Sequence, residues 1–99
     1  MTDRELLEAA ARAIGYRQHG YHPTSGLQIL GEPLSYFWNP ITYIGDRYRL
    51  LKALKMAIDF EIFEVIYLVD GNICAQSFRD DGDDARAVLR AAAEIGRNM

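Results

Sequence analysis

The chain has 99 residues, of which 49% are hydrophobic and 25% are charged, and its formal net charge is −3. These values are ordinary for globular proteins, so we expect one folded domain over residues 1–99 and exclude the disordered classes. The acidic balance argues against nucleic-acid binding by the surface as a whole, because phosphate binding depends on clustered lysines and arginines.

Cys74 is the only cysteine, which excludes an intrachain disulfide and a cysteine-rich zinc site and fits a reducing compartment. The first residues include Asp and Glu where a signal peptide has a basic region and then an apolar stretch. No apolar run in the sequence reaches the length of a membrane span. We therefore expect a cytoplasmic protein without a membrane partner.

The first predicted helix covers residues 3–14. Thr2 and Glu5 have the spacing of a capping box, in which each side chain accepts a hydrogen bond from the other's backbone amide. Apolar residues repeat at helical spacing from position 6 to position 14, and Gly15 is typical of the residue that follows a helix end.

Residues 16–45 contain single glycines and prolines, among them Pro33, that divide this segment into short pieces. Short strands are predicted at residues 16–19, 27–30 and 36–38. Residues 20–26 are predicted to be a turn. The third strand is expected to end at Trp38-Asn39-Pro40, because proline disfavours the helical conformation in the residue before it.

The clearest strand in the sequence is the segment 60–69. Both of its alternate faces are mainly apolar, so we expect both faces to be covered. Asp70-Gly71 is typical of a two-residue hairpin turn, and residues 73–78 are therefore expected to pair back antiparallel.

Two further helices are predicted in the second half of the chain. One covers residues 46–57, with Asp46 as an N-cap or first-turn acid. The other follows the acidic run 80–84, which suits a helix N-terminus, and is expected to end at Gly96. The assembled order is α-β-β-α-β-β-α. It predicts an α+β fold in which three helices and an antiparallel sheet of about four strands form a layered helix–sheet–helix sandwich.

Three segments carry a resemblance to a known group of proteins. They are Trp38-Asn39-Pro40, the Gly-Asp-Arg-Tyr-Arg-Leu segment at 45–50, and the closing Arg-Ala-Val-Leu-Arg-Ala-Ala-Ala-Glu-Ile-Gly segment at 86–96. Together they resemble small accessory proteins of tailed-phage and prophage genomes in the phage ABA sandwich domain group. The resemblance implies a helix–sheet–helix sandwich, a viral origin with action in the bacterial cytoplasm, and no enzymatic activity.

The densest aromatic cluster contains Tyr36, Phe37, Trp38 and Tyr43. One interpretation is that these rings fill the core beneath a short strand. The other is an aromatic anchor at a protein interface, where Trp and Tyr contribute much of the binding energy. If Trp38 is buried, the second interpretation depends on the tyrosines.

The segment 46–56 is basic and contains Arg47, Arg49 and Lys52 around Tyr48. Basic residues interleaved with aromatic residues can follow phosphates and stack on bases, so the segment is a candidate nucleic-acid contact. The alternative is the solvated face of an amphipathic helix, in which the aliphatic stems cover apolar edges.

The acidic run contains Asp80, Asp81 and Asp83, which either cap the last helix or contact a basic partner surface. His19 and His22 lie near a Gly/Pro turn without the helix that would aim two metal ligands, so we interpret them as ordinary surface histidines. No nucleophile, acid–base pair or Gly-rich phosphate loop converges in the sequence. We therefore expect no enzyme, no metal and no cofactor.

These observations and the resemblance favour a binding protein. The concrete hypothesis is that the chain inhibits or modulates a bacterial host protein. That host protein could be a component of a defence system, such as one that acts by CRISPR interference. Two alternatives are a nucleic-acid-binding module that uses residues 46–56 and a self-associating structural phage component. The second of these includes a homodimer formed through an edge strand or through the alanine-rich face of the last helix.

Overall fold

The computed structural model describes residues 2–31 and 34–99, so Pro33, predicted as a break in the chain, lies outside the described residues. The elements in chain order are α1 (Asp3–Ala13), β1 (Gln18–His22), β2 (Gly26–Ile29), β3 (Tyr36–Trp38), α2 (Ile44–Ala53), β4 (Ala57–Asp59), β5 (Glu64–Val69), β6 (Asn72–Ser77) and α3 (Asp84–Arg97). All the strand pairings are antiparallel.

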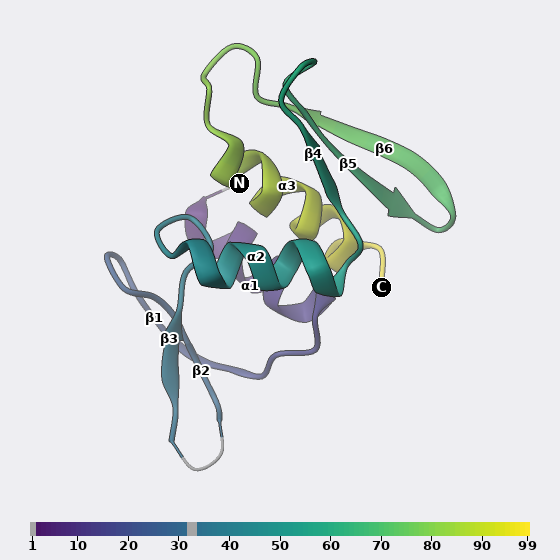
Figure 1. Ribbon diagram of the computed structural model, residues 1–99. Helices are drawn as coiled ribbons and strands as arrows, with labels where there is room; N and C mark the ends of the chain where they lie inside the picture. Colours follow the sequence, from purple (N-terminus) through teal and green to yellow (C-terminus); the bar gives the residue numbers. More distant parts are fainter. Residues whose placement is uncertain (1, 32–33) are drawn as a thin grey trace.

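The helices lie between two sheets, one of order β1-β2-β3 and the other of order β4-β5-β6 (Figure 1). The α1 helix packs on the first sheet, α3 packs on the second, and the two helices pack on each other. The predicted α+β class, with three helices and antiparallel strands, is confirmed. The layers differ from those predicted, because the strands divide into two sheets and the helix pair occupies the middle of the molecule.

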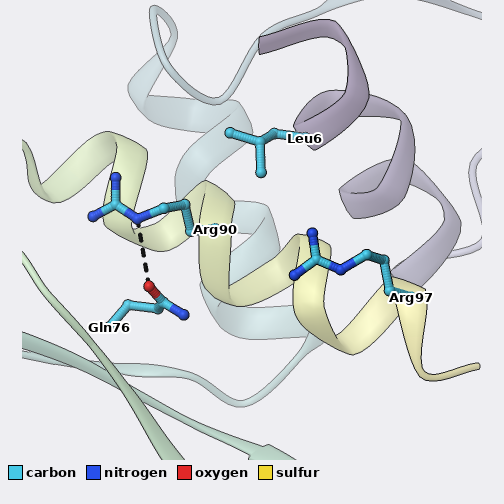
Figure 2. Close-up of a pocket in the computed structure, with 4 residues that line it drawn as sticks. All are labelled: Leu6, Gln76, Arg90 and Arg97. Atoms are coloured by element: carbon cyan, nitrogen blue, oxygen red, sulfur yellow. Dashed lines mark hydrogen bonds between the residues drawn. The ribbon is translucent and has the colours of Figure 1, made fainter. Parts of the chain in front are cut away.

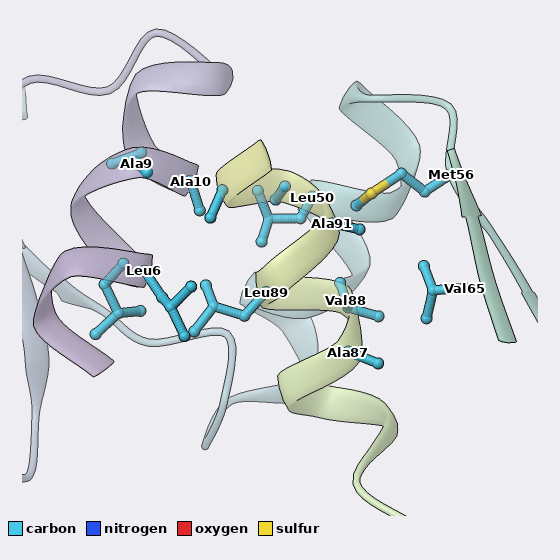
Figure 3. Packing of buried hydrophobic residues seen from close by; sticks show 14 of the residues in the cluster. Leu6, Ala9, Ala10, Leu50, Met56, Val65, Ala87, Val88, Leu89 and Ala91 are labelled. Carbon is cyan, nitrogen blue, oxygen red and sulfur yellow. The ribbon is translucent and has the colours of Figure 1, made fainter. Parts of the chain in front are cut away.

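Small side chains allow α1 and α3 to pack closely. Ala9 and Ala10 of α1 face α3 and are buried, as is Ala91 of α3 (Figure 3). A Cβ atom at Gly96 would overlap the carbonyl oxygen of Ala9 and lie 2.8 Å from its carbonyl carbon. The predicted helix end at Gly96 is therefore wrong. Helix α3 continues to Arg97, and this glycine is the point where the backbones approach each other.

The ends of α1 are determined by local sequence, as predicted. The side chains of Thr2 and Glu5 form the reciprocal capping box. Gly15 adopts a left-handed conformation with φ of 77°. The amide of Tyr16 donates to the carbonyl of Ala11 across this glycine (2.9 Å) and closes the helix.

The first sheet is a meander whose turn is shorter than predicted. Strand β1 extends to His22 and pairs with Gly26, so only three of the residues predicted as a turn at 20–26 connect the strands. The ring of His22 accepts a hydrogen bond from the amide of Thr24 (3.3 Å), which closes the turn. Trp38 pairs with Leu27 on the central strand β2 and is fully buried.

Helix α2 ends earlier than the predicted residue 57. Its last residue is Ala53, and Lys55 then adopts a left-handed conformation with φ of 54°. The amide of Met56 donates to the carbonyl of Leu51 across this turn (2.9 Å). Residues 57 and 58, which fit the helical spacing of the apolar face, consequently belong to β4.

The predicted strand 60–69 begins only at Glu64. Residues 60–63 form the connection between β4 and β5, in which the carboxylate of Asp59 accepts from the amide of Glu61 (2.9 Å). Phe63 adopts a left-handed φ of 58° and ends this connection. The predicted Asp70-Gly71 hairpin is confirmed, since Val69 pairs with Asn72.

The expectation that both faces of this strand are covered is wrong. Val65 and Tyr67 point toward α3 and are buried, whereas Leu68 is 51% exposed on the opposite face. The second sheet packs on the helices with one face only, so the apolar alternation of β5 leaves an exposed outer face. The apolar residues of β5 therefore face the core on one side of the sheet and solvent on the other.

Candidate functional site

Three of the residues predicted for partner binding have structural roles, and the first is Trp38. Its ring is 0% exposed and contacts Tyr16 edge to face, with a centroid distance of 5.5 Å. Its indole N–H has no acceptor among the residues that the structure describes. The core interpretation therefore holds for this residue, and an interface anchor must use other aromatic residues.

Arg47 is the second of these residues. Its side chain is only 16% exposed and turns back toward the loop before α2. The Nε atom donates to the carbonyl of Pro40 (3.1 Å), and the Nη2 atom donates to the carbonyl of Ile41 (3.5 Å). Nη1 also lies 3.9 Å from the carboxylate of Asp84. These contacts connect the loop before α2 to the start of α3, so Arg47 has a structural role.

Asp83 is the third. Its carboxylate accepts from the amide of Arg86 (2.9 Å) and forms an ion pair with the guanidinium of the same residue (3.3 Å). It is therefore the N-cap of α3, where a carboxylate also benefits from the helix dipole. Asp80 and Asp81 remain exposed in the preceding loop.

The tyrosines of the predicted cluster do not form one patch. Tyr36 is 40% exposed. Its pKa is raised mainly by partial burial and, to a smaller extent, by the neighbouring hydroxyl of Tyr16. Tyr43 is 47% exposed at the start of α2. Tyr48 is 63% exposed and lines a separate apolar hollow of about 240 Å³ that also contains Phe60. The aromatic residues thus divide between different surfaces.

A polar network connects the second sheet to α3. The hydroxyl of Tyr67 donates to the carboxylate of Glu94, and the amide of Gln76 donates to that hydroxyl (3.0 Å). Burial and the hydrogen bond to Glu94 raise the pKa of Tyr67 to about 12. The network therefore holds the phenol in its neutral form.

The network borders a hollow of about 270 Å³ beside β6 and α3, shown in Figure 2. Arg90 lines this hollow and is already engaged, because it donates to the side-chain oxygen of Gln76 (3.4 Å) and to the carbonyl of Ser77 (3.2 Å). These bonds fix the inner side of β6 to the helix.

Strand β6 is an edge strand of the second sheet and carries the highly exposed Ile73. Within the residues that the structure describes, it has a partner on one side only, in the order β4-β5-β6. In an antiparallel ladder, successive residues direct their backbone groups alternately toward and away from the partner strand. The amide of Phe78 donates to the carbonyl of Phe63 in the same register (2.9 Å). By alternation, Ile73 and Ala75 direct their amide and carbonyl groups toward the free edge.

The outer face beside this edge is apolar. Ile73 is 79% exposed and lies opposite Leu68 on β5, which is 51% exposed. The register of β5 and β6 runs without a bulge, and the segment 72–77 contains no charged residue and no proline. Natural edge strands usually contain a charged residue, a proline or a bulge, each of which prevents association with another strand. Sequence analysis did not predict this surface, although the absence of charge over these six residues is a signal that could have identified it.

Arg49 and Lys52 are exposed on α2 and line a hollow of about 450 Å³ together with Ile14, Tyr16 and Ala53. The structure thus separates the predicted basic segment, because Arg47 is engaged elsewhere. Two basic residues, Arg49 and Lys52, remain exposed in this segment, and they line the same hollow as the ring of Tyr16.

Metal and membrane sites have no structural support within residues 2–31 and 34–99. No three His, Cys, Asp or Glu side chains gather there in a way that could hold a metal ion. In the same part of the chain, none of the helices has both the length and the apolar character needed to cross a membrane.

Comparison of the chain with protein-family models, with curated proteins and with solved structures gives no match. The function must therefore be argued from the surfaces described above.

Proposed function

We propose that this chain is a non-catalytic binding protein that adds an extended segment of another protein to the free edge of β6. The observation that carries the proposal is the unprotected edge. The backbone groups of Ile73 and Ala75 point outward from a regular strand without charge, proline or bulge. In strand addition, backbone hydrogen bonds provide affinity, and side-chain contacts on the sheet face provide specificity.

The outer sheet face provides the side-chain contacts. Ile73 and Leu68 lie opposite each other on adjacent strands and are both more than half exposed. A strand added beside β6 would place every second side chain next to this pair. An occupant with apolar residues at alternate positions therefore suits the edge best.

The charges at the two ends of β6 favour a different protein over a second copy. Asp70 precedes the strand, and Asp80 and Asp81 follow it and are exposed. Between them, Arg79 donates to the carbonyl of Ile62 (3.3 Å) and stacks on the ring of Phe63. Two copies of β6 would place acidic residues beside acidic residues in either strand direction, which opposes self-pairing. Basic residues on both sides of an apolar strand would complement the edge.

The resemblance to small phage proteins suggests where such a partner occurs. A phage accessory protein without an active site acts by occupying the surface of another molecule. Accordingly, we expect the partner to be a bacterial host protein, such as a component of a CRISPR defence system, and the encounter to take place in the host cytoplasm. The exposed Asp80 and Asp81 would then contact basic residues of that protein.

A defined peptide tests the edge directly. The probe is the synthetic peptide Lys-Thr-Val-Thr-Val-Thr-Lys, and the measurement is its fluorescence anisotropy together with amide chemical shifts of β6. We expect binding to be weakened by about tenfold or more in Ala75→Pro, because proline removes an edge amide without removing a ladder bond. Ala75→Thr keeps that amide and is expected to bind as the unmodified protein does.

Three results would contradict the proposal. Equal binding by Ala75→Pro would show that the edge is not the site. Equal affinity for the same peptide with Glu at both ends would exclude the charge argument. A dimer in light scattering that Ala75→Pro dissociates would assign the edge to a second copy of the chain.

A further inference from the structure

The hollow of about 450 Å³ lies beside the end of α1 and the exposed side of α2, away from β6. Its volume is within the range of small-molecule sites, roughly 300–1,000 Å³. Ile14 and Ala53 form its apolar wall, and the ring of Tyr16 forms another. The remaining lining residues, Arg49 and Lys52, are both positively charged.

Arg49 and Lys52 contribute two positive charges on α2, and Asp46 of the same helix contributes one negative charge. Arg49 and Lys52 are three residues apart, so they lie on the same face of α2. Neither has an ion-pair partner in the part of the chain that the structure describes, whereas Arg47 of the same helix does. The carboxylate of Asp46 accepts from the amide of Asn39 (3.0 Å), a neutral group that leaves its negative charge in place, so the two cations exceed one negative charge on the same helix. The hollow therefore offers a net positive charge to a ligand.

The aromatic side of the hollow is the ring of Tyr16, which packs on the core and carries one hydroxyl group. The edge-to-face contact with Trp38 holds the ring of Tyr16 against the buried core. The phenol group of Tyr16 lines the same hollow as the two cations, and its hydroxyl can donate to an oxygen acceptor.

We propose that this hollow binds a phosphomonoester carried on a planar ring, the chemistry of a mononucleotide. Arg49 offers a planar donor pair that matches phosphate geometry, and Lys52 adds a compact positive charge. The ring of Tyr16 and the side chain of Ile14 provide the surface on which a base can pack. This site is independent of strand addition at β6, so either proposal can fail without the other.

Titration of AMP into the protein, followed by calorimetry and by amide chemical shifts, tests the site. We expect shifts at Ile14, Tyr16 and Ala53, and weaker binding of both adenosine and inorganic phosphate than of AMP. Arg49→Gln and Lys52→Gln should each weaken AMP binding by about tenfold, the effect of one lost charge-assisted hydrogen bond.

Two control variants separate recognition from general charge and from folding. Lys55→Gln removes one positive charge from the same segment outside the lining, and we expect a change of less than about twofold, because exposed charges are screened by salt. Tyr16→Phe keeps the ring that packs on Trp38 and removes only the hydroxyl, so reduced AMP binding with an unchanged unfolding midpoint supports a direct contact.

The source of the phosphate is tested with a short single-stranded oligonucleotide. Tighter binding of the 5′-phosphorylated strand than of the unphosphorylated strand keeps the site and identifies a strand end as its ligand. Equal binding of both strands overturns the proposal. Absence of AMP-induced shifts around Tyr16, or equal AMP affinity of Arg49→Gln and the unmodified protein, overturns it as well.

Discussion

Replacement of Gly96 by alanine is expected to destabilise the protein, although alanine is the better helix former. Gly96 lies inside α3 and is buried against α1. The added Cβ would overlap the carbonyl oxygen of Ala9 and would lie 3.3 Å from the amide nitrogen of Ala13. Both are backbone atoms, so no side-chain rotation can relieve the overlap. The two helices must move apart.

The magnitude follows from two opposing contributions. Alanine in place of glycine within a helix gains roughly 0.5–1 kcal/mol through backbone entropy and helix propensity. Overpacking of a close-packed site costs about 1–3 kcal/mol, and contact with backbone atoms favours the upper end of that range. We therefore expect a net loss of about 2 kcal/mol in the free energy of unfolding. For a domain of this size, such a loss lowers the melting temperature by about 8–16 °C.

Urea unfolding followed by circular dichroism measures this difference. Gly45→Ala is the matched control, because Gly45 is also helical and no described atom lies within 4 Å of a Cβ added there. We expect this control to stabilise the protein by about 0.5 kcal/mol. If Gly96→Ala were as stable as the unmodified protein, or shifted in the same direction as the control, the close helix crossing would be refuted.

Two further predictions concern charged and ionisable groups. Arg47→Gln should reduce the free energy of unfolding by about 1–3 kcal/mol, because two loop carbonyls lose a charged donor. Arg49→Gln should change the free energy of unfolding by no more than about 0.5 kcal/mol. Similar urea midpoints for the two variants would contradict these roles. The pKa of Tyr67 is raised from 10.0 to about 12, so its contribution to stability should be complete below pH 10 and decline as the pH rises toward 12. The Tyr67→Phe variant should lose this pH dependence, and an unchanged profile in urea unfolding would argue against the Glu94 network.

Local features of the sequence were sufficient for the helix start at Thr2, the helix stop at Gly15 and the hairpin at Asp70-Gly71. Each depends on hydrogen bonds and backbone angles within a few consecutive residues. The structure confirms all three. The α+β class followed from the same kind of evidence, since the alternation of helical and strand periods is visible along the chain.

The site residues could be predicted only in part. Asp80, Asp81, Arg49 and Lys52 were predicted as partner-binding residues, and the structure leaves all four exposed. The neighbouring Arg47 has the same chemistry and a similar position in the sequence. It is structural only because the loop carbonyls before α2 fall within its reach.

The sequence by itself determined where the main helices and the hairpin form, because these depend on near neighbours in the chain. Only the tertiary structure decided that the helices lie between two sheets, that Gly96 meets the backbone of Ala9, and that the outer face of β5 and β6 stays exposed. An apolar residue at Leu68 has the same pattern whether a helix or solvent lies opposite it. Which of the two is present depends on segments far away in the chain, whose packing no local period records.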